Sequence, residues 1–193
     1  MNRSRLLFIA AALAFASLAS VSFAKTEEYK KVTFDEFFAG SVASIPLSLD
    51  IPSQYSYAKA VSNRATTYSY WMRADEVARA VKTQDLPAKT GYIYGKLTPN
   101  EAYDRSIRKF TTEDQLEGQA AQAGLEVIEQ KRFEAKGYPV FAYIVKAKNG
   151  TVVCSMFVGT LIDTNVLYFG YRPPKNDLKI GQAVWSHILD SLK

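Results

Sequence analysis

The C-terminal third of the chain limits the fold most strongly, because four apolar stretches follow one another there with only short turns between them. The stretches are rich in β-branched and aromatic residues, which is typical of β-strands. Asn149-Gly150, between the second and third stretch, is a strong signal for a two-residue hairpin. Strands with such short connections pair antiparallel. The stretches are residues 125–134, 138–148, 151–162 and 166–172.

The third stretch is apolar on both of its alternating faces. Cys154 and Met156 would point to one side of the sheet, and Val153 and Phe157 to the other. A sheet that is apolar on both faces has to be covered on both. The sequence therefore predicts an α+β fold in which helices flank an antiparallel β-sheet.

Helices are expected where a capping residue or an acidic first turn opens a segment, namely over residues 33–40, 74–84, 111–124 and 177–193. Residues 44–52 alternate as a half-buried strand does. Thr98, Pro99 and Glu101 have the spacing of a capping box with Pro in the first turn. Residues 99–110 are nevertheless compatible with either a helix or a strand. The inward face of the last helix is expected to comprise Ile180, Val184, Ile188 and Leu192.

Three tyrosine pairs and an adjacent tryptophan are the candidate binding residues. The two tyrosines of each pair lie two positions apart, so in a strand both rings point to one face. Tyrosine offers a large contact area and a polar tip, which suits protein, peptide and glycan surfaces. The residues are Tyr55 and Tyr57, Tyr68 and Tyr70 with Trp71, and Tyr92 and Tyr94.

The same rings could instead pack inside the fold, since aromatic pairs also stabilise sheets. We expect this packing role for at least two of the three pairs. Tyr92–Tyr94 is the expected exception, because Gly91 and Gly95 bracket a stretch that is short for a central strand.

Residues 1–24 have the features of a cleaved signal peptide. Arg3 and Arg5 precede an apolar run, and Ser22 and Ala24 are the small residues expected before a cleavage site. The run is short for a membrane anchor, and we expect no membrane-spanning segment after cleavage. Residues 25–193 are therefore predicted to form a single globular domain, located in a bacterial periplasm or secreted.

The inventory of reactive residues argues against an enzyme. Cys154 is the only cysteine and His187 the only histidine, so no disulfide can form within the chain and a multi-histidine zinc site is excluded. Cys154 lies between apolar residues in the middle of a predicted strand, and His187 lies at the border of the apolar stripe of the last helix, so both are expected to be structural. We expect no cofactor and no metal. Paired carboxylates such as Asp75-Glu76 are the remaining candidates for a hydrolase, which we rank third among the possible functions.

Nucleic acid is not expected as a partner either. The formal net charge is +5, of which the predicted signal peptide contributes two, and the remaining basic residues alternate with acidic ones. Such a mild and evenly spread charge lacks the electrostatic footprint of a nucleic-acid-binding protein.

From residue 45 onward the order of these elements resembles the Mog1/PsbP-like superfamily. The resembling pieces are LSLDIPSQY (47–55), the helix over 111–124 before the strand over 125–134, GYPVFAYIVKAKNGT (137–151), VLYFGYR (166–172) and WSHILDSLK (185–193). The resemblance implies an α/β/α sandwich. Its known members are mostly non-enzymatic binders: a GTPase-binding import factor, photosystem accessory subunits, and bacterial chaperones or immunity-like proteins. It supplies no active site to carry over.

The predicted function is that of an exported, non-catalytic binding or accessory protein. Its partner would be another protein or a peptide of the bacterial envelope, and inhibition of a toxic enzyme is one concrete form of this function. The alternative is a small-molecule or glycan-binding protein that uses the tyrosine-rich face.

Overall fold

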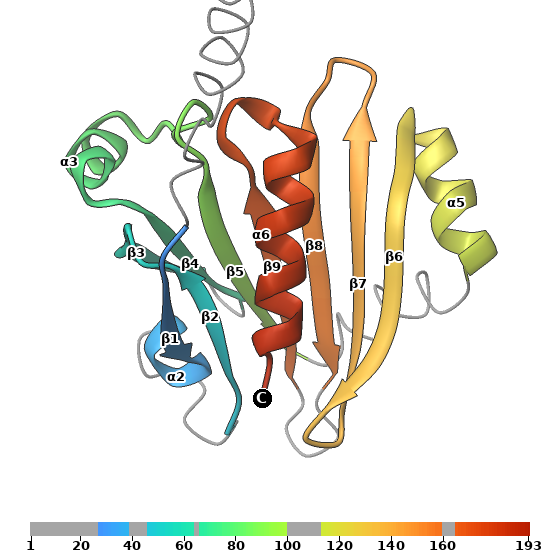
Figure 1. The fold of residues 1–193 in the computed structure, drawn as a ribbon. Coiled ribbons are helices and arrows are strands. Elements are labelled where there is room, and N and C mark those ends of the chain that lie inside the picture. Colours follow the sequence, from blue (N-terminus) through green and yellow to red (C-terminus); the bar gives the residue numbers. More distant parts are fainter. Residues whose placement is uncertain (1–26, 39–45, 64–65, 100–112, 160–164) are drawn as a thin grey trace, which may run out of the picture.

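The computed structural model describes residues 27–38, 46–63, 66–99, 113–159 and 165–193. Within these residues, seven antiparallel strands form one sheet in the order β3-β4-β5-β9-β8-β7-β6 (Figure 1). A smaller antiparallel sheet pairs β1 with β2. The predicted α+β fold, an antiparallel sheet flanked by helices, is therefore confirmed.

The large sheet contains β3 (Tyr55–Asn63), β4 (Thr66–Arg73), β5 (Tyr92–Pro99), β6 (Leu125–Ala135), β7 (Tyr138–Ala147), β8 (Val152–Gly159) and β9 (Asn165–Arg172). The small sheet contains β1 (Tyr29–Thr33) and β2 (Ser48–Pro52). The helices are α2 (Phe34–Phe37), α3 (Ala74–Thr83), α5 (Glu113–Gln122), α6 (Leu178–Ser191) and the short 3-10 helix η2 (Pro174–Asn176). No helix of the described residues is long and apolar enough to cross a membrane.

Strands β6 to β9 form the antiparallel meander that the sequence predicted. A hairpin at Asn149-Gly150 is also present, but its loop has three residues rather than two, since the Ala147 N–H donates a hydrogen bond of 2.8 Å to the Thr151 carbonyl. Gly150, with a φ of 81°, takes the left-handed position of this longer loop. Strand β5 then pairs with β9, although the two are distant in the chain. The expectation that Thr98 and Pro99 open a helix is wrong, because both residues end strand β5. They pair there with Val166 and Asn165 of β9. Residues 100–112 lie outside the described residues.

We call the sheet face that α6 covers the inner face (Figure 1). Helix α6 begins at Asp177, whose side chain accepts a hydrogen bond of 3.1 Å from the Ile180 N–H. Of the expected inward residues, Val184, Ile188 and Leu192 are buried, but Ile180 is 42% exposed. The inward stripe starts instead at Gly181, whose carbonyl accepts a hydrogen bond from the Cys154 thiol of β8. A Cβ at Gly181 would lie 3.2 Å from Pro173 Cγ, so the glycine makes room for that proline.

The β1–β2 sheet and α2 cover the rest of the inner face. Thr33 caps α2 as the sequence predicted, with its hydroxyl accepting a hydrogen bond from the Glu36 N–H. The Phe37 ring stacks on Trp71 of β4, and the Phe37 carbonyl accepts a hydrogen bond of 3.2 Å from the Trp71 indole. The rings of Phe37 and Phe38 occupy the space where a side chain at Gly95 would lie. The core of the protein is therefore on this face.

Candidate functional site

The opposite face of the sheet, which we call the outer face, carries the candidate site. Strand alternation sends every second residue there, and pairing places these residues in two rows across six strands. One row runs Tyr70, Tyr94, Gly170, Ser155, Tyr143 and Gln130 over β4, β5, β9, β8, β7 and β6. The adjacent row runs Tyr68, Lys96, Tyr168, Phe157, Phe141 and Arg132 over the same strands.

The rings of these rows, with Tyr92, form a continuous aromatic band. The ring centroids of neighbours lie 5.0–6.5 Å apart, within the usual range for aromatic pairs. A cation lies near each end: Lys96 Nζ is 5.8 Å from the Tyr68 ring, and Arg132 Cζ is 4.7 Å from the Phe141 ring. These ring contacts connect Tyr70, Tyr92, Tyr94, Phe141, Tyr143, Phe157 and Tyr168, and we count Tyr68, which lies beside Lys96 in the second row, as part of the band.

Hydroxyl groups connect the middle of the aromatic band. The Tyr168 hydroxyl lies 2.7 Å from Ser155 Oγ and 3.0 Å from the Tyr94 hydroxyl. Burial raises the pKa of Tyr94, and the neighbouring Tyr168 raises this pKa further. Burial also raises the pKa of Tyr143, which a hydrogen bond with Ser155 partly offsets. Tyr94 and Tyr143 are therefore neutral at physiological pH, and the centre of the band is polar but uncharged.

Gly170 makes room for the Tyr94 ring. The two residues face each other across the β5–β9 pairing, and a Cβ at Gly170 would overlap the far end of that ring. The ring can therefore reach across β9 toward Tyr168. The glycine is explained by this close approach and not by its backbone angles.

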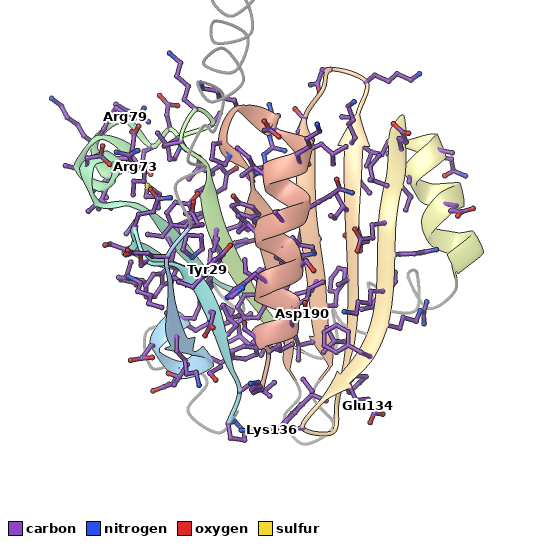
Figure 2. All side chains as sticks on the ribbon, viewed as in Figure 1. Tyr29, Arg73, Arg79, Glu134, Lys136 and Asp190 are labelled. Carbon is purple, nitrogen blue, oxygen red and sulfur yellow. The ribbon has the colours of Figure 1, made fainter. Side chains whose placement is uncertain are left out.

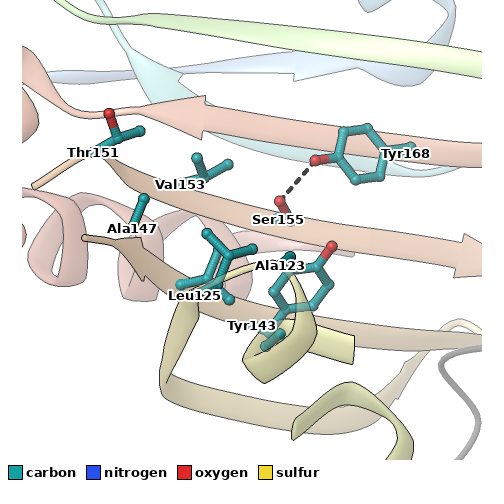
Figure 3. A pocket seen from close by; sticks show the side chains of 10 residues that line it. Ala123, Leu125, Tyr143, Ala147, Thr151, Val153, Ser155 and Tyr168 are labelled. Carbon is teal, nitrogen blue, oxygen red and sulfur yellow. Dashed lines mark hydrogen bonds between the residues drawn. The ribbon is translucent and has the colours of Figure 1, made fainter. Parts of the chain in front are cut away.

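A pocket opens where α5 meets the outer face (Figure 3). Its volume is about 320 Å³. Helix α5 packs against β6 at the edge of the sheet (Figure 1). Residues of this helix and of strands β6 to β9 line the pocket. Its lining consists of Ala120, Ala123, Leu125, Tyr143, Val145, Ala147, Thr151, Val153, Ser155 and Tyr168.

The candidate binding residues divide between the two faces. Tyr68, Tyr70, Tyr92 and Tyr94 belong to the aromatic band and are half-buried. Tyr55, Tyr57 and Trp71 lie on the inner face: Tyr55 is 1% exposed, Trp71 is buried, and Tyr57 at the sheet edge is 39% exposed. The reason given for treating Tyr92–Tyr94 as the exception is wrong, because β5 is a central strand that pairs with both β4 and β9.

Four further band residues were not among the residues predicted from the sequence. They are Phe141, Tyr143, Phe157 and Tyr168. A signal was available, since Phe141 and Tyr143 repeat the two-position spacing of the pairs. Their place beside Tyr94 depends on the β5–β9 pairing, which short-range patterns do not specify.

Cys154 and His187 take up separate places on the inner face side. Burial raises the pKa of the Cys154 thiol to about 12. Tyr29 of β1 lies beside α6 (Figure 2), and the His187 ring of that helix stacks on the Tyr29 ring at 3.6 Å. The His187 Nε2 lies 3.6 Å from an Asp50 carboxylate oxygen. His187 therefore packs against β1 and β2, whereas the Cys154 thiol contacts the Gly181 carbonyl of α6. In the part of the chain that the structure describes, no group of three or more potential ligand residues could hold a metal ion.

Cys154 is expected to react slowly with thiol reagents in the native protein. The thiolate is the reactive species, and burial suppresses it. At pH 8, maleimide labelling should be more than about a hundredfold slower than that of a free cysteine. The same protein in denaturant should label at the free-cysteine rate. Fast labelling of the folded protein, measured by mass spectrometry, would show that the thiol is accessible.

Comparison with known proteins identifies the fold of the chain but not its function. No family model matches the chain, and neither does any curated protein. The crystal structure of the Ran-binding protein Mog1p from Saccharomyces cerevisiae has a TM-score of 0.50 at 13% sequence identity, over 87% of this chain and 96% of that chain. The solution structure of PsbP from Synechocystis sp. PCC 6803 has a TM-score of 0.46 at 7% identity, over 92% and 98%. The likeness to Mog1p shows that the chain has the Mog1/PsbP-like fold.

Proposed function

We propose that this chain is an exported, non-catalytic binding protein of the bacterial envelope, and that the aromatic band is its binding surface for another protein or a peptide. The observation that carries the proposal is the continuity of the band over five neighbouring strands, β4, β5, β9, β8 and β7. Adjacent strands lie about 4.8 Å apart, so the band extends over roughly 19 Å. That length suits an extended macromolecular partner better than one small ligand.

The chemistry of the aromatic band supports a protein partner. Half-buried tyrosines provide rigid apolar contact area together with hydroxyls that donate and accept hydrogen bonds, and such residues dominate interface energetics. Lys96 and Arg132 place positive charge near the two ends. A complementary partner segment would have an apolar centre flanked by acidic residues. The Mog1/PsbP-like fold is compatible with this role, since the similar Mog1p is named for binding Ran.

Two further features support the proposal that the protein is non-catalytic and that it is exported. The only cysteine is buried with a raised pKa, so it is a poor nucleophile. The leader-like sequence at 1–24 supports export, and we propose 25–193 as the mature chain, a single domain.

Photo-crosslinking in cells tests the binding surface. A photoreactive phenylalanine analogue replaces Tyr92 in the aromatic band or, as the matched control, Tyr57 on the other side of the sheet. We expect the Tyr92 position to yield one discrete crosslinked protein and the Tyr57 position to yield none. The double variant Tyr70→Ala, Phe141→Ala should then reduce binding of that protein at least tenfold, because truncating aromatic anchors costs about 2 kcal/mol or more. Crosslinks from Tyr57 alone would contradict the proposal.

A further inference from the structure

The pocket beneath α5 exists because small side chains surround its entrance. Ala120 of α5, Ala123 just after it and Ala147 of β7 all line the pocket, and Figure 3 shows Ala123 and Ala147 among its walls. Larger side chains at these positions would fill the space. Leu125, Val145 and Val153, together with the alanines, make most of the wall apolar.

The size of the pocket limits what it can hold. Its volume of about 320 Å³ lies at the lower end of the range for small-molecule sites. An apolar protein cavity of about 150 Å³ accommodates benzene. By that measure this pocket holds a molecule of roughly twelve non-hydrogen atoms.

One side of the pocket is polar. Ser155 lies at its floor, only 1% exposed, with its hydroxyl 2.7 Å from the Tyr168 hydroxyl. Tyr143 contributes a third hydroxyl to the lining. In such a network each hydroxyl can act as donor or as acceptor, because its proton rotates to suit the partner. The polar side can therefore satisfy either a hydroxyl or a carbonyl group of a ligand.

We propose that this pocket binds a small, neutral, apolar molecule that carries one hydroxyl or carbonyl group. The apolar part contacts the alanine, leucine and valine wall, and the polar group hydrogen-bonds to the Ser155–Tyr168 hydroxyls. This function goes beyond the binding of a protein by the aromatic band and does not depend on it.

The described lining of the pocket disfavours ionised ligands. None of the described residues that line the pocket is Asp, Glu, Lys, Arg or His. Burial raises the pKa of Tyr143, so this phenol also stays neutral. An ionised ligand would lose its hydration without gaining a counter-charge from these described lining residues, which is strongly unfavourable.

Three related probes test the proposal on the full protein: 2-naphthol, naphthalene and 2-naphthoate, titrated by ligand fluorescence at pH 7. We expect 2-naphthol to bind about two- to tenfold more tightly than naphthalene, as one net hydrogen bond allows. The charged 2-naphthoate should bind more weakly than both. In Ser155→Ala, 2-naphthol should lose its advantage over naphthalene. Equal affinities of the three probes for the unaltered protein would overturn the proposal.

Variants locate the binding site. Ala123→Phe should fill the pocket and weaken 2-naphthol binding more than tenfold, whereas Ala121→Phe, at an exposed position outside the lining, should leave the affinity unchanged. Tyr70→Ala, in the aromatic band but outside the pocket, should also leave it unchanged. Ala147→Leu provides a second filled pocket if Ala123→Phe does not fold. Undiminished binding in a folded filled-pocket variant, or loss of binding in Tyr70→Ala, would show that the probe binds elsewhere.

Discussion

Replacing Phe169 by alanine is expected to destabilise the protein by about 3–5 kcal/mol, the usual cost of removing a large aromatic side chain from a core. Phe169 is 1% exposed and lies on the inner face of β9. Its ring centroid is 4.8 Å from that of Phe34, and it also contacts Phe37 and Phe38. These contacts join α2 and the residue after it to the large sheet. Urea unfolding followed by circular dichroism measures the loss.

The neighbouring Tyr168 provides the matched control for this measurement. It lies on the outer face, and Tyr168→Phe keeps the ring while removing a hydroxyl that contacts Ser155 and Tyr94. We expect a loss of about 1–2 kcal/mol, the net value of the hydrogen bonds involved. A loss for Phe169→Ala that does not exceed that of Tyr168→Phe would contradict the assignment of the core to the inner face.

Gly170→Ala is expected to destabilise the protein by about 1–3 kcal/mol through overpacking. The added methyl group would overlap the Tyr94 ring, which would have to leave its place beside Tyr168. The free energy of unfolding, again from urea titration, measures the effect.

A double-mutant cycle shows whether the Tyr94 ring is the cause. In a Tyr94→Ala background the space over Gly170 is empty, so Gly170→Ala should cost nothing or stabilise slightly, because alanine suits a strand better than glycine. Gly118→Ala in α5 is the control with no steric neighbour within 4 Å, and there alanine should stabilise the helix by up to about 1 kcal/mol. An equal cost of Gly170→Ala with and without the Tyr94 ring would exclude our explanation of this glycine.

Much of the fold follows from short-range patterns. The alternation in residues 125–172 and the Asn149-Gly150 turn predict the meander, because each of its strands pairs with the next strand in the chain. The cap at Thr33 is equally local. Ile180 was misplaced because the sequence periodicity does not show that Gly181 takes the inward position against β8.

The candidate site could be predicted only in part, because it depends on pairing between distant strands. The spacing of Tyr68 with Tyr70 and of Tyr92 with Tyr94 predicts that each pair shares a face. It does not predict that β5 lies beside β9, which is what brings Tyr94 to Tyr168. The same spacing occurs in Tyr55 and Tyr57, which lie on the other face.

The pairing of β5 with β9 also affects how the chain reaches its native state. Within the seven-stranded sheet it is the one pairing between strands that are not consecutive, since it joins two meanders, β3–β5 and β6–β9. Contacts between such distant segments form late, because a long loop has to close first. Until residues 165–172 emerge from the ribosome, one edge of β5 lacks its partner and can pair with another chain. We therefore expect late folding and an early vulnerability to aggregation at β5, both of which would make the nascent chain dependent on chaperones.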